Sequence, residues 1–364
     1  MSNPTLAFGI EVELLFRPDE ELIRKHMSGW TAGLAHGLDT DPAKINRKIL
    51  RLAIAKELTG AGVAAEVSTQ EYDAWSVLDE AMLDERPNFW RLELVSRCMT
   101  TDVDWQKEIT TVFDTIRRIE DIQLTKGCST HVHVSPSRGG NRYQIGQLRS
   151  IMKAIAYFDR AVTAAVPADR KENEWAASNF KEKSCNRTYA ELHGNISSLT
   201  WGPLFQKFDG VRLPALIPAD VFHNRYVSWN FKHLGSECGT VEFRRPPGVE
   251  DARRALYWVA FTLGFLEGAM GFDLSDVKEE RKHGTFQDLQ ERIFDGLTRL
   301  GPTCAGIIGR VDGIGEYKSE PTPASREEKE VIAAKKTEKL DKESNFVVKV
   351  NSRPSTPASA SASS

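Results

Sequence analysis

Four short stretches of the chain alternate apolar residues with ionisable ones, the pattern of a β-strand that buries one of its faces. They are FGIEVELLF with Glu11 and Glu13, WRLELVSR with Glu93, THVHVS with His131 and His133, and GTVEFR with Glu242 and Arg244. Ionisable groups avoid buried positions unless they are paired or bind a metal. We therefore predict one sheet whose concave face is an ionic pocket and whose other face is covered by helices.

Apolar residues recur at every third or fourth position in the segments between these strands, which predicts amphipathic helices. The predicted helices span residues 41–58, 104–119, 143–166, 250–270 and 285–300. The first has Asp41 as its expected N-cap and Pro42 at its first position. Further strands are expected within 63–80 and over 225–231, and the latter forms a hairpin with GTVEFR. Residues 17–33 read as irregular, and residues 168–219 as loops and short elements that line a substrate pocket.

The composition changes near residue 315, which divides the chain into two predicted parts. Residues 1–315 form a catalytic domain, and residues 316–364 form a low-complexity tail that ends in SRPSTPASASASS. The tail holds too little apolar surface to offset the entropy of ordering, so we expect disorder there, apart from a solvated helix near 325–343.

Charge and hydropathy narrow the classes of partner. The formal net charge is -3, and no block of basic residues marks a nucleic-acid surface. No apolar run approaches the ~18 residues of a membrane span, and the N-terminus shows no secretory leader. We expect a cytoplasmic protein that binds small molecules and contacts neither nucleic acid nor membrane. The sequence does not specify an oligomeric state.

The ionisable strands carry a set of groups suited to hard cations and phosphate. Glu11 and Glu13 lie ~7 Å apart along a strand, a spacing that suits two neighbouring cations better than one. With Glu93, Glu242 and one or both of the paired histidines, the donors are mostly oxygens, which favours Mg²⁺ or Mn²⁺ over Zn²⁺. Such cations beside Arg244 neutralise phosphoryl oxygens. We infer a nucleotide site, although the chain has no Gly-x-x-x-x-Gly-Lys-Ser/Thr loop.

Each motif also has a structural interpretation. Glu-x-Glu on a strand is commonly a solvated edge. His-x-His can be a hydrogen-bonded pair in a core, and Glu242 with Arg244 can form a cross-strand charge ladder. The same alternation in four separate strands favours a functional site over chance.

The order of the motifs resembles the amidoligases of the glutamine synthetase and glutamate–cysteine ligase superfold. The matching order is FGIEVEL, a Trp-Ser-Val strand ending in Asp79, LELVS, THVHVS, Asn-Arg-Thr-Tyr at 186–189, VSWNF, and GTVEFR before a helix with Trp258. The likeness covers roughly residues 7 to 270. Two departures are Ser129, where a glycine is usual, and the sequence SVLDEAM around Asp79, where either Asp79 or Glu80 could serve as a ligand.

This resemblance implies an α+β fold in which an antiparallel sheet, backed by helices, forms a funnel that binds ATP and two or three Mg²⁺ or Mn²⁺ ions. The implied metal ligands are Glu11, Glu13, Glu93, His131 and Glu242. Arg244 matches the arginine that contacts phosphate, and Arg187 and Asn230 match positions that face the nucleotide or the substrate.

The implied reaction joins a small carboxylate substrate to an amine through an acyl phosphate. Catalytic roles fall to Glu242 and Arg244, and the proton of the amine passes either to His133 or to a carboxylate. The substrates are expected to be amino acids, peptides or small amines. Two alternatives remain at this stage. One is a metal-dependent hydrolase that uses His131 and His133, with His193, His223 or His233 as further ligands. The other is a non-catalytic binding protein.

Overall fold

The structure is a computed structural model that describes residues 3–32, 40–68, 72–136, 142–307 and 317–351, without the side chains of Glu120 and of 340–351. The chain divides into two compact units, residues 1–323 and residues 324–364. The predicted boundary after residue 315 and the predicted disorder of 352–364 fall outside the described residues. Within the second unit, α12 (Arg326–Asn351) covers the segment where a solvated helix was expected.

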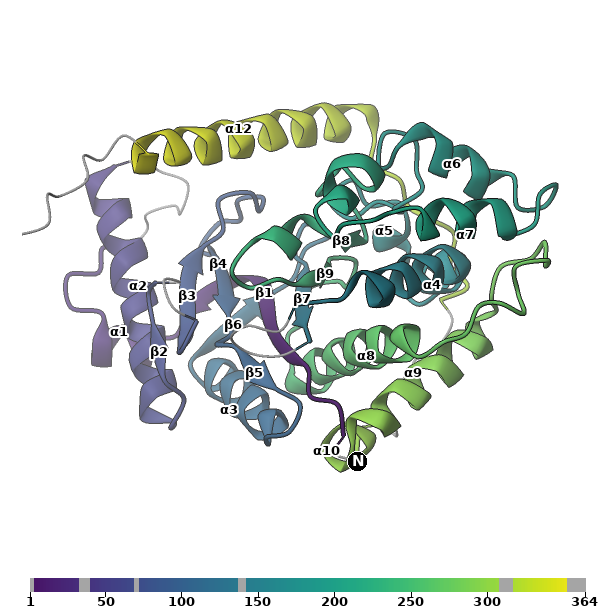
Figure 1. The fold of residues 1–364 in the computed structure, drawn as a ribbon. Helices are drawn as coiled ribbons and strands as arrows, with labels where there is room; N and C mark the ends of the chain where they lie inside the picture. Colours follow the sequence, from purple (N-terminus) through teal and green to yellow (C-terminus); the bar gives the residue numbers. More distant parts are fainter. Residues whose placement is uncertain (1–2, 33–39, 69–71, 137–141, 308–316, 352–364) are drawn as a thin grey trace, which may run out of the picture. The chain divides into compact units, whose positions relative to one another are not determined.

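A nine-stranded sheet organises the first unit, and Figure 1 shows β1 near its middle. The strands are β1 (Ala7–Pro18), β2 (Ala65–Glu66), β3 (Trp75–Asp79), β4 (Trp90–Val95), β5 (Met99–Thr100), β6 (Glu120–Gln123), β7 (Thr130–Ser135), β8 (Trp229–Asn230) and β9 (Val241–Phe243). The strand order is β2-β3-β4-β1-β7-β9-β8, and β5 and β6 also pair with β1. Among the named strands of the described residues only β2 and β3 pair in parallel, so a largely antiparallel sheet is confirmed.

Helices α2, α3 and α8 pack against the sheet. The helices of the first unit are α1 (Glu20–His26), α2 (Asp41–Gly60), α3 (Trp105–Arg118), α4 (Ile145–Ala164), α5 (Ala168–Lys171), α6 (Arg187–Gly194), α7 (Gly202–Asp209), α8 (Ala252–Met270), α9 (Phe286–Leu300) and α10 (Pro302–Ala305). Phe8 of β1 meets Trp105 of α3 edge to face, and Phe243 of β9 stacks on Phe261 of α8. Because neighbouring residues on a strand face opposite ways, these contacts turn the adjacent ionisable residues away from the helices.

The helix that supports β7 and β9 is itself held by a close helix pair. A Cβ atom on Gly296 of α9 would lie 2.0 Å from the backbone oxygen of Gly264 in α8. Only glycine permits this approach, since any side chain would force the helices apart. The close packing of α8 on α9 therefore gives the sheet a firm backing on its apolar side.

The predicted helices all form, with small shifts at their ends, and several other predictions need correction. Residues 20–26 form α1 rather than an irregular segment, because the Asp19 side chain caps the helix by accepting from the backbone N–H of Leu22. The N-cap of α2 is Thr40, not Asp41. The strand expected over 225–231 is only β8. The loops and short elements expected over 168–219 are confirmed, because this segment contains the short helices α5, α6 and α7 and the start of a π-helix, Ile217–Val221. No helix among the described residues is long and apolar enough to cross a membrane.

Candidate active site

The register of the strands places the ionisable residues in adjacent rows on one face of the sheet. The opposed pairs are Glu13 with Glu93, Glu11 with His131, His133 with Glu242, and Glu242 with Asn230. Side chains at opposed positions of antiparallel strands lie close enough to interact directly. Residues from stretches more than 200 positions apart in the sequence thus meet over β1, β4, β7, β8 and β9.

One group of donors consists of Glu13, Glu93 and His131, whose ligand atoms lie within 4.8 Å of one another. Ser129 joins two of them: its hydroxyl donates to Glu13 Oε2 at 2.6 Å and lies 2.9 Å from His131 Nε2. The backbone N–H of Ser129 donates to the same carboxylate oxygen. Ser129 was noted in the sequence only as a departure from a glycine. Its position two residues before His131 already placed it on the same strand face.

A second group consists of Glu11, His131 and Glu242, again with ligand atoms within 4.8 Å. His131 Nδ1 lies 3.0 Å from Glu11 Oε2 and 3.5 Å from Glu242 Oε1. His131 therefore belongs to both groups, with Nε2 toward Ser129 and Nδ1 toward the two carboxylates. A neutral imidazole has a single nitrogen lone pair, so His131 can be a ligand in only one of the two groups at a time.

Glu242 is the most buried carboxylate of the site, with 1% of its surface exposed. Asn230 donates from Nδ2 to its Oε2 at 2.7 Å, and Arg244 donates from Nη1 to its Oε1. Asn230 and Arg244 were expected to face a nucleotide, and both are joined to the same carboxylate. Nε of Arg244 is buried and makes no hydrogen bond within the described part of the chain, so it remains available as a donor.

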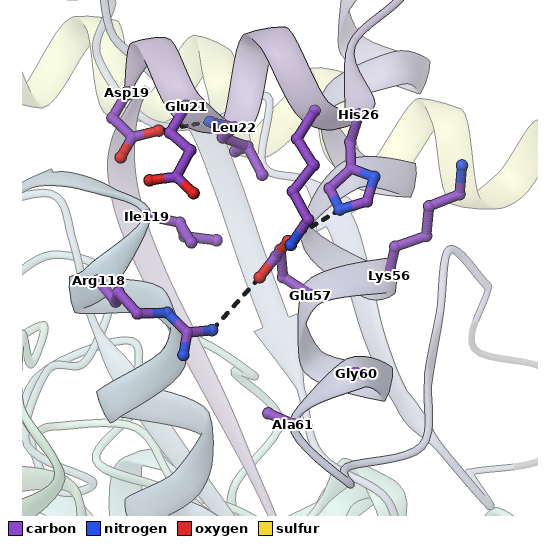
Figure 2. Close-up of a pocket in the computed structure, with 11 residues that line it drawn as sticks. Asp19, Glu21, Leu22, His26, Lys56, Glu57, Gly60, Ala61, Arg118 and Ile119 are labelled. Atoms are coloured by element: carbon purple, nitrogen blue, oxygen red, sulfur yellow. Dashed lines mark hydrogen bonds and ion pairs between the residues drawn. The ribbon is translucent and has the colours of Figure 1, made fainter.

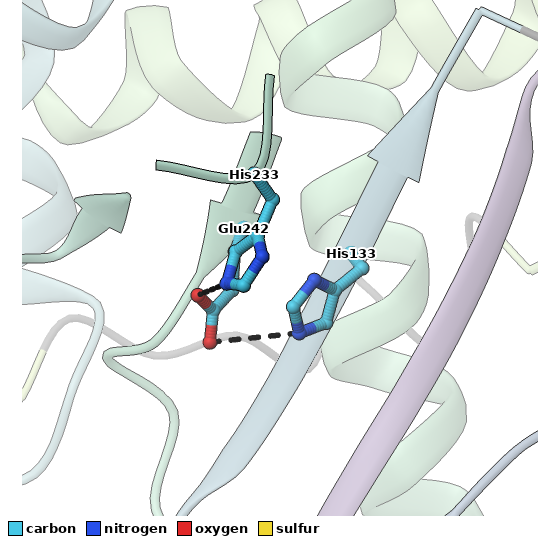
Figure 3. A group of neighbouring side chains, drawn as sticks. All are labelled: His133, His233 and Glu242. Carbon is cyan, nitrogen blue, oxygen red and sulfur yellow. Dashed lines mark ion pairs between the residues drawn. The ribbon is translucent and has the colours of Figure 1, made fainter. Parts of the chain in front are cut away.

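Two further imidazoles lie beside Glu242. Figure 3 shows the rings of His133 and His233 next to its carboxylate, with an ion pair to each. His133 is on β7, and His233 lies in the 3₁₀ turn Lys232–Gly235 that connects β8 to β9. The sequence analysis considered His233 only as a ligand of a hydrolase, because nothing in its local pattern places it near the strand histidines.

The charges of the site shift the pKa values of its members in opposite directions. Burial by itself would lower the pKa of His133, but Glu11 and Glu242 raise it to about 9. Burial by itself would raise the pKa of Glu242, but Arg244 and the two strand histidines lower it to about 2. The pKa of Glu11 is likewise held well below its ordinary value, chiefly by His133 acting against burial. The cation-free site is therefore a network of charged partners.

This network predicts how the stability of the cation-free protein depends on pH. The pKa of His133 is raised from 6.5 to about 9, so its stabilising contribution is complete below pH 6.5 and is lost as the pH rises through about 9. We expect the free energy of unfolding, measured by urea titration of chelator-treated protein, to fall across that window. In His133→Gln the fall should be smaller. An equal fall in both proteins would contradict the assignment.

A buried guanidinium outside the predicted set supports the end of β9. Arg170 of α5 is 1% exposed and donates from Nη2 to the backbone oxygen of Arg244 at 2.9 Å and from Nε to that of Arg245 at 3.0 Å. In return, Arg245 donates to the backbone oxygens of Arg170 and Lys171. Burial lowers the pKa of Arg170 to about 10. The pair fixes the backbone from which Arg244 projects, and the charged segment around residue 170 gave no sign of it.

Two residues proposed from the sequence form ion pairs with helix residues outside this cluster. Arg187 is the first residue of α6, with 90% of its side chain exposed, and it forms an ion pair with Glu191 of the same helix. Asp79, at the end of β3, lies 3.7 Å from Arg47 and 3.8 Å from Arg51 of α2. A role for Arg187 toward a nucleotide stays a prediction.

A separate cleft of about 520 Å³ lies between α1, α2 and the end of α3 (Figure 2). The buried Glu57 carboxylate at its base contacts Lys25, His26 and Arg118, at 2.5, 2.8 and 3.3 Å. Three cationic or ionisable partners on one carboxylate tie three helices together. The cluster has no contact with the ionic face of the sheet among the described residues, so we interpret it as structural.

Residues 4–266 match the sequence profile of a family described as "Putative amidoligase enzyme". The match covers more than half of the chain and includes every strand of the sheet. No curated protein sequence matches the chain.

Proposed function

The chain belongs to the amidoligase enzyme family, and from this premise we propose that it is an ATP-dependent carboxylate–amine ligase that works through an acyl phosphate. The observation that carries the proposal is the convergence of Glu11, Glu13, Glu93, His131, Glu242 and Arg244 on one face of the sheet. A funnel shape like that of glutamine synthetase is part of the same proposal.

The donor set fits Mg²⁺ or Mn²⁺. Four carboxylates and one imidazole form two overlapping groups whose ligand atoms lie within 4.8 Å, and hard cations favour such oxygen-rich sites. Glu13 and Glu93 would hold one ion and Glu11 and Glu242 another. His131 would be a ligand of one of the two, because a neutral imidazole has a single nitrogen lone pair. When bound, these ions would neutralise the phosphate oxygens of ATP and thereby reduce their repulsion of an incoming carboxylate.

Arg244 has the geometry needed to bind a phosphoryl group. Its Nη1 donates to Glu242, which fixes the plane of the guanidinium, while its buried Nε has no hydrogen-bond partner among the described residues. A buried donor without a partner is unfavourable, so a phosphate oxygen that accepts from it would be bound strongly. Arg170 holds the backbone of Arg244 in place from behind.

The proposed reaction has two steps. An oxygen of the substrate carboxylate attacks the γ-phosphorus of ATP, the bond to the β-phosphate oxygen breaks, and ADP leaves. The nitrogen of a neutral amine then attacks the acyl carbon, phosphate departs with the bonding electrons, and an amide remains. The amine loses one proton, which His133 or a carboxylate of the site accepts. Arg244 stabilises the charge that develops on the transferring phosphoryl group.

The test is to incubate the full chain with ATP, Mg²⁺ and pooled small carboxylic acids, amino acids and amines, and to identify the products by mass. We expect ADP, phosphate and a new amide in equal amounts. Release of AMP instead of ADP would show that the intermediate is an acyl adenylate and not an acyl phosphate. Hydrolysis of a substrate without nucleotide would favour the metal-dependent hydrolase. No nucleotide consumption with any acid and amine pair would contradict the proposal.

A further inference from the structure

We propose that His133, His233 and Glu242 form an additional site for a divalent cation of the borderline class, represented by Zn²⁺ and Co²⁺. This site lies beside the oxygen-rich groups and shares Glu242 with one of them. The proposal rests on the geometry of these three side chains and does not depend on ligase activity.

The spacing of the donors suits one small ion. His133 Nε2 lies 3.5 Å from Glu242 Oε1, and His233 Nε2 lies 3.6 Å from Glu242 Oε2. Two donors bound to one ion at ~2.1 Å with a tetrahedral angle between them are ~3.4 Å apart. All three ligand atoms lie within 4.8 Å of one another. Small rotations of the side chains would therefore bring the donors into coordination distance.

His133 is oriented for a ligand on its Nε2 atom. Its Nδ1 lies 3.3 Å from the hydroxyl of Thr240. In metal-bound histidines, a contact of this kind at the other ring nitrogen sets the orientation of the ring. The Nε2 atom is buried and points between two carboxylates, 3.2 Å from Glu11 Oε1 and 3.5 Å from Glu242 Oε1. These separations suit an ion bound between the nitrogen and a carboxylate oxygen, because two donors that share one small cation lie about 3.4 Å apart.

Asn230 holds the other two ligands in place. Its Oδ1 accepts from the backbone N–H of Lys232, which begins the turn that carries His233, and its Nδ2 donates to Glu242 Oε2. The ring of His233 meets that of His133 edge to face, with centroids 5.4 Å apart. A carboxylate oxygen has lone pairs for more than one partner, so Glu242 can keep its bond to Asn230 and still bind an ion.

The types of donor determine which ion is favoured. Two imidazole nitrogens with one carboxylate are a common set for Zn²⁺ and Co²⁺, whereas Mg²⁺ is held by oxygens and water. The preference for Mg²⁺ or Mn²⁺ inferred from the sequence applies to the groups around His131. With only three protein ligands, the additional ion would keep a position open for water or for a substrate oxygen.

Cobalt provides a direct test because Co²⁺ in a tetrahedral site of nitrogen and oxygen donors gives intense visible absorption. The full chain is freed of metal with a chelator, placed in excess Mg²⁺ without nucleotide, and titrated with Co²⁺ while absorbance and bound metal are followed. We expect one tetrahedral Co²⁺ per chain, and we expect Zn²⁺ to displace it.

The matched variants are His233→Asn and His223→Asn. His223 is an exposed imidazole ten residues earlier in the sequence, so its loss serves as the control. We expect His233→Asn to weaken Co²⁺ binding by at least about 100-fold, the upper end of what loss of a supporting group causes. His223→Asn should bind as wild type does, and circular dichroism should show that both variants are folded. Tetrahedral Co²⁺ retained in His233→Asn, or its absence from wild type, would overturn the proposal. Neither result would contradict the proposed ATP-dependent reaction, which is tested separately by its products.

Discussion

Replacing Glu242 with glutamine is expected to reduce ATP consumption by at least about 100-fold. Loss of a residue that only supports a metal ligand typically costs about 10–100-fold, and loss of the ligand itself should cost no less. Glu242 belongs to two of the three candidate cation groups, and it also accepts from both Asn230 and Arg244. The amide of glutamine keeps the size of the side chain but removes its charge. Cation binding and the alignment of Arg244 should therefore be lost together.

The effect is measured as ADP formed with the substrate pair that supports turnover in wild type. Glu250→Gln is the matched control, because Glu250 pairs with Arg254 at the start of α8, where both side chains are largely exposed. It should retain wild-type activity. Equal ATP consumption by Glu242→Gln and wild type would remove Glu242 from the mechanism and with it the proposed assignment of the site.

Replacing Arg170 with alanine is expected to lower the free energy of unfolding by about 3 kcal/mol, since each buried acceptor left without a partner costs ~1–3 kcal/mol. The backbone oxygens of Arg244 and Arg245 both lose their donor, and a cavity remains in place of the guanidinium. The end of β9 is then no longer fixed, so activity should fall as well.

Urea unfolding monitored by tryptophan fluorescence measures this loss of stability. Arg187→Ala provides the contrast, because its ion pair with Glu191 on α6 is exposed to solvent and should contribute little to stability. The same Arg187 variant tests the sequence-based prediction that this residue faces the nucleotide. Arg170→Ala with wild-type stability would show that the two carbonyl groups find other donors and that the guanidinium pair does not hold β9.

The local pattern of the chain was enough to predict the strands that carry the candidate site. Strict alternation fixed which residues share a face, and it placed Glu11 with Glu13, and Glu242 with Arg244, opposite the apolar positions that pack on the helices. This works because the side-chain period of a strand is two, whatever the rest of the fold does. The short helices within 168–219 could not be predicted in the same way, because their apolar runs are too brief to establish a period.

What the sequence alone determined is therefore the chemistry available on each strand, the antiparallel sheet and the main helices behind it. Only the tertiary structure decided that His233 joins His133 at Glu242, that Ser129 links Glu13 to His131, and that Arg170 supports the backbone of Arg244. The physical reason is that hydrophobic periodicity reports which way a side chain points from its own strand or helix. Contacts between loops and strands that are distant in sequence depend instead on the register of strand pairing and on the turns that connect the strands. A local sequence pattern does not predict either of these.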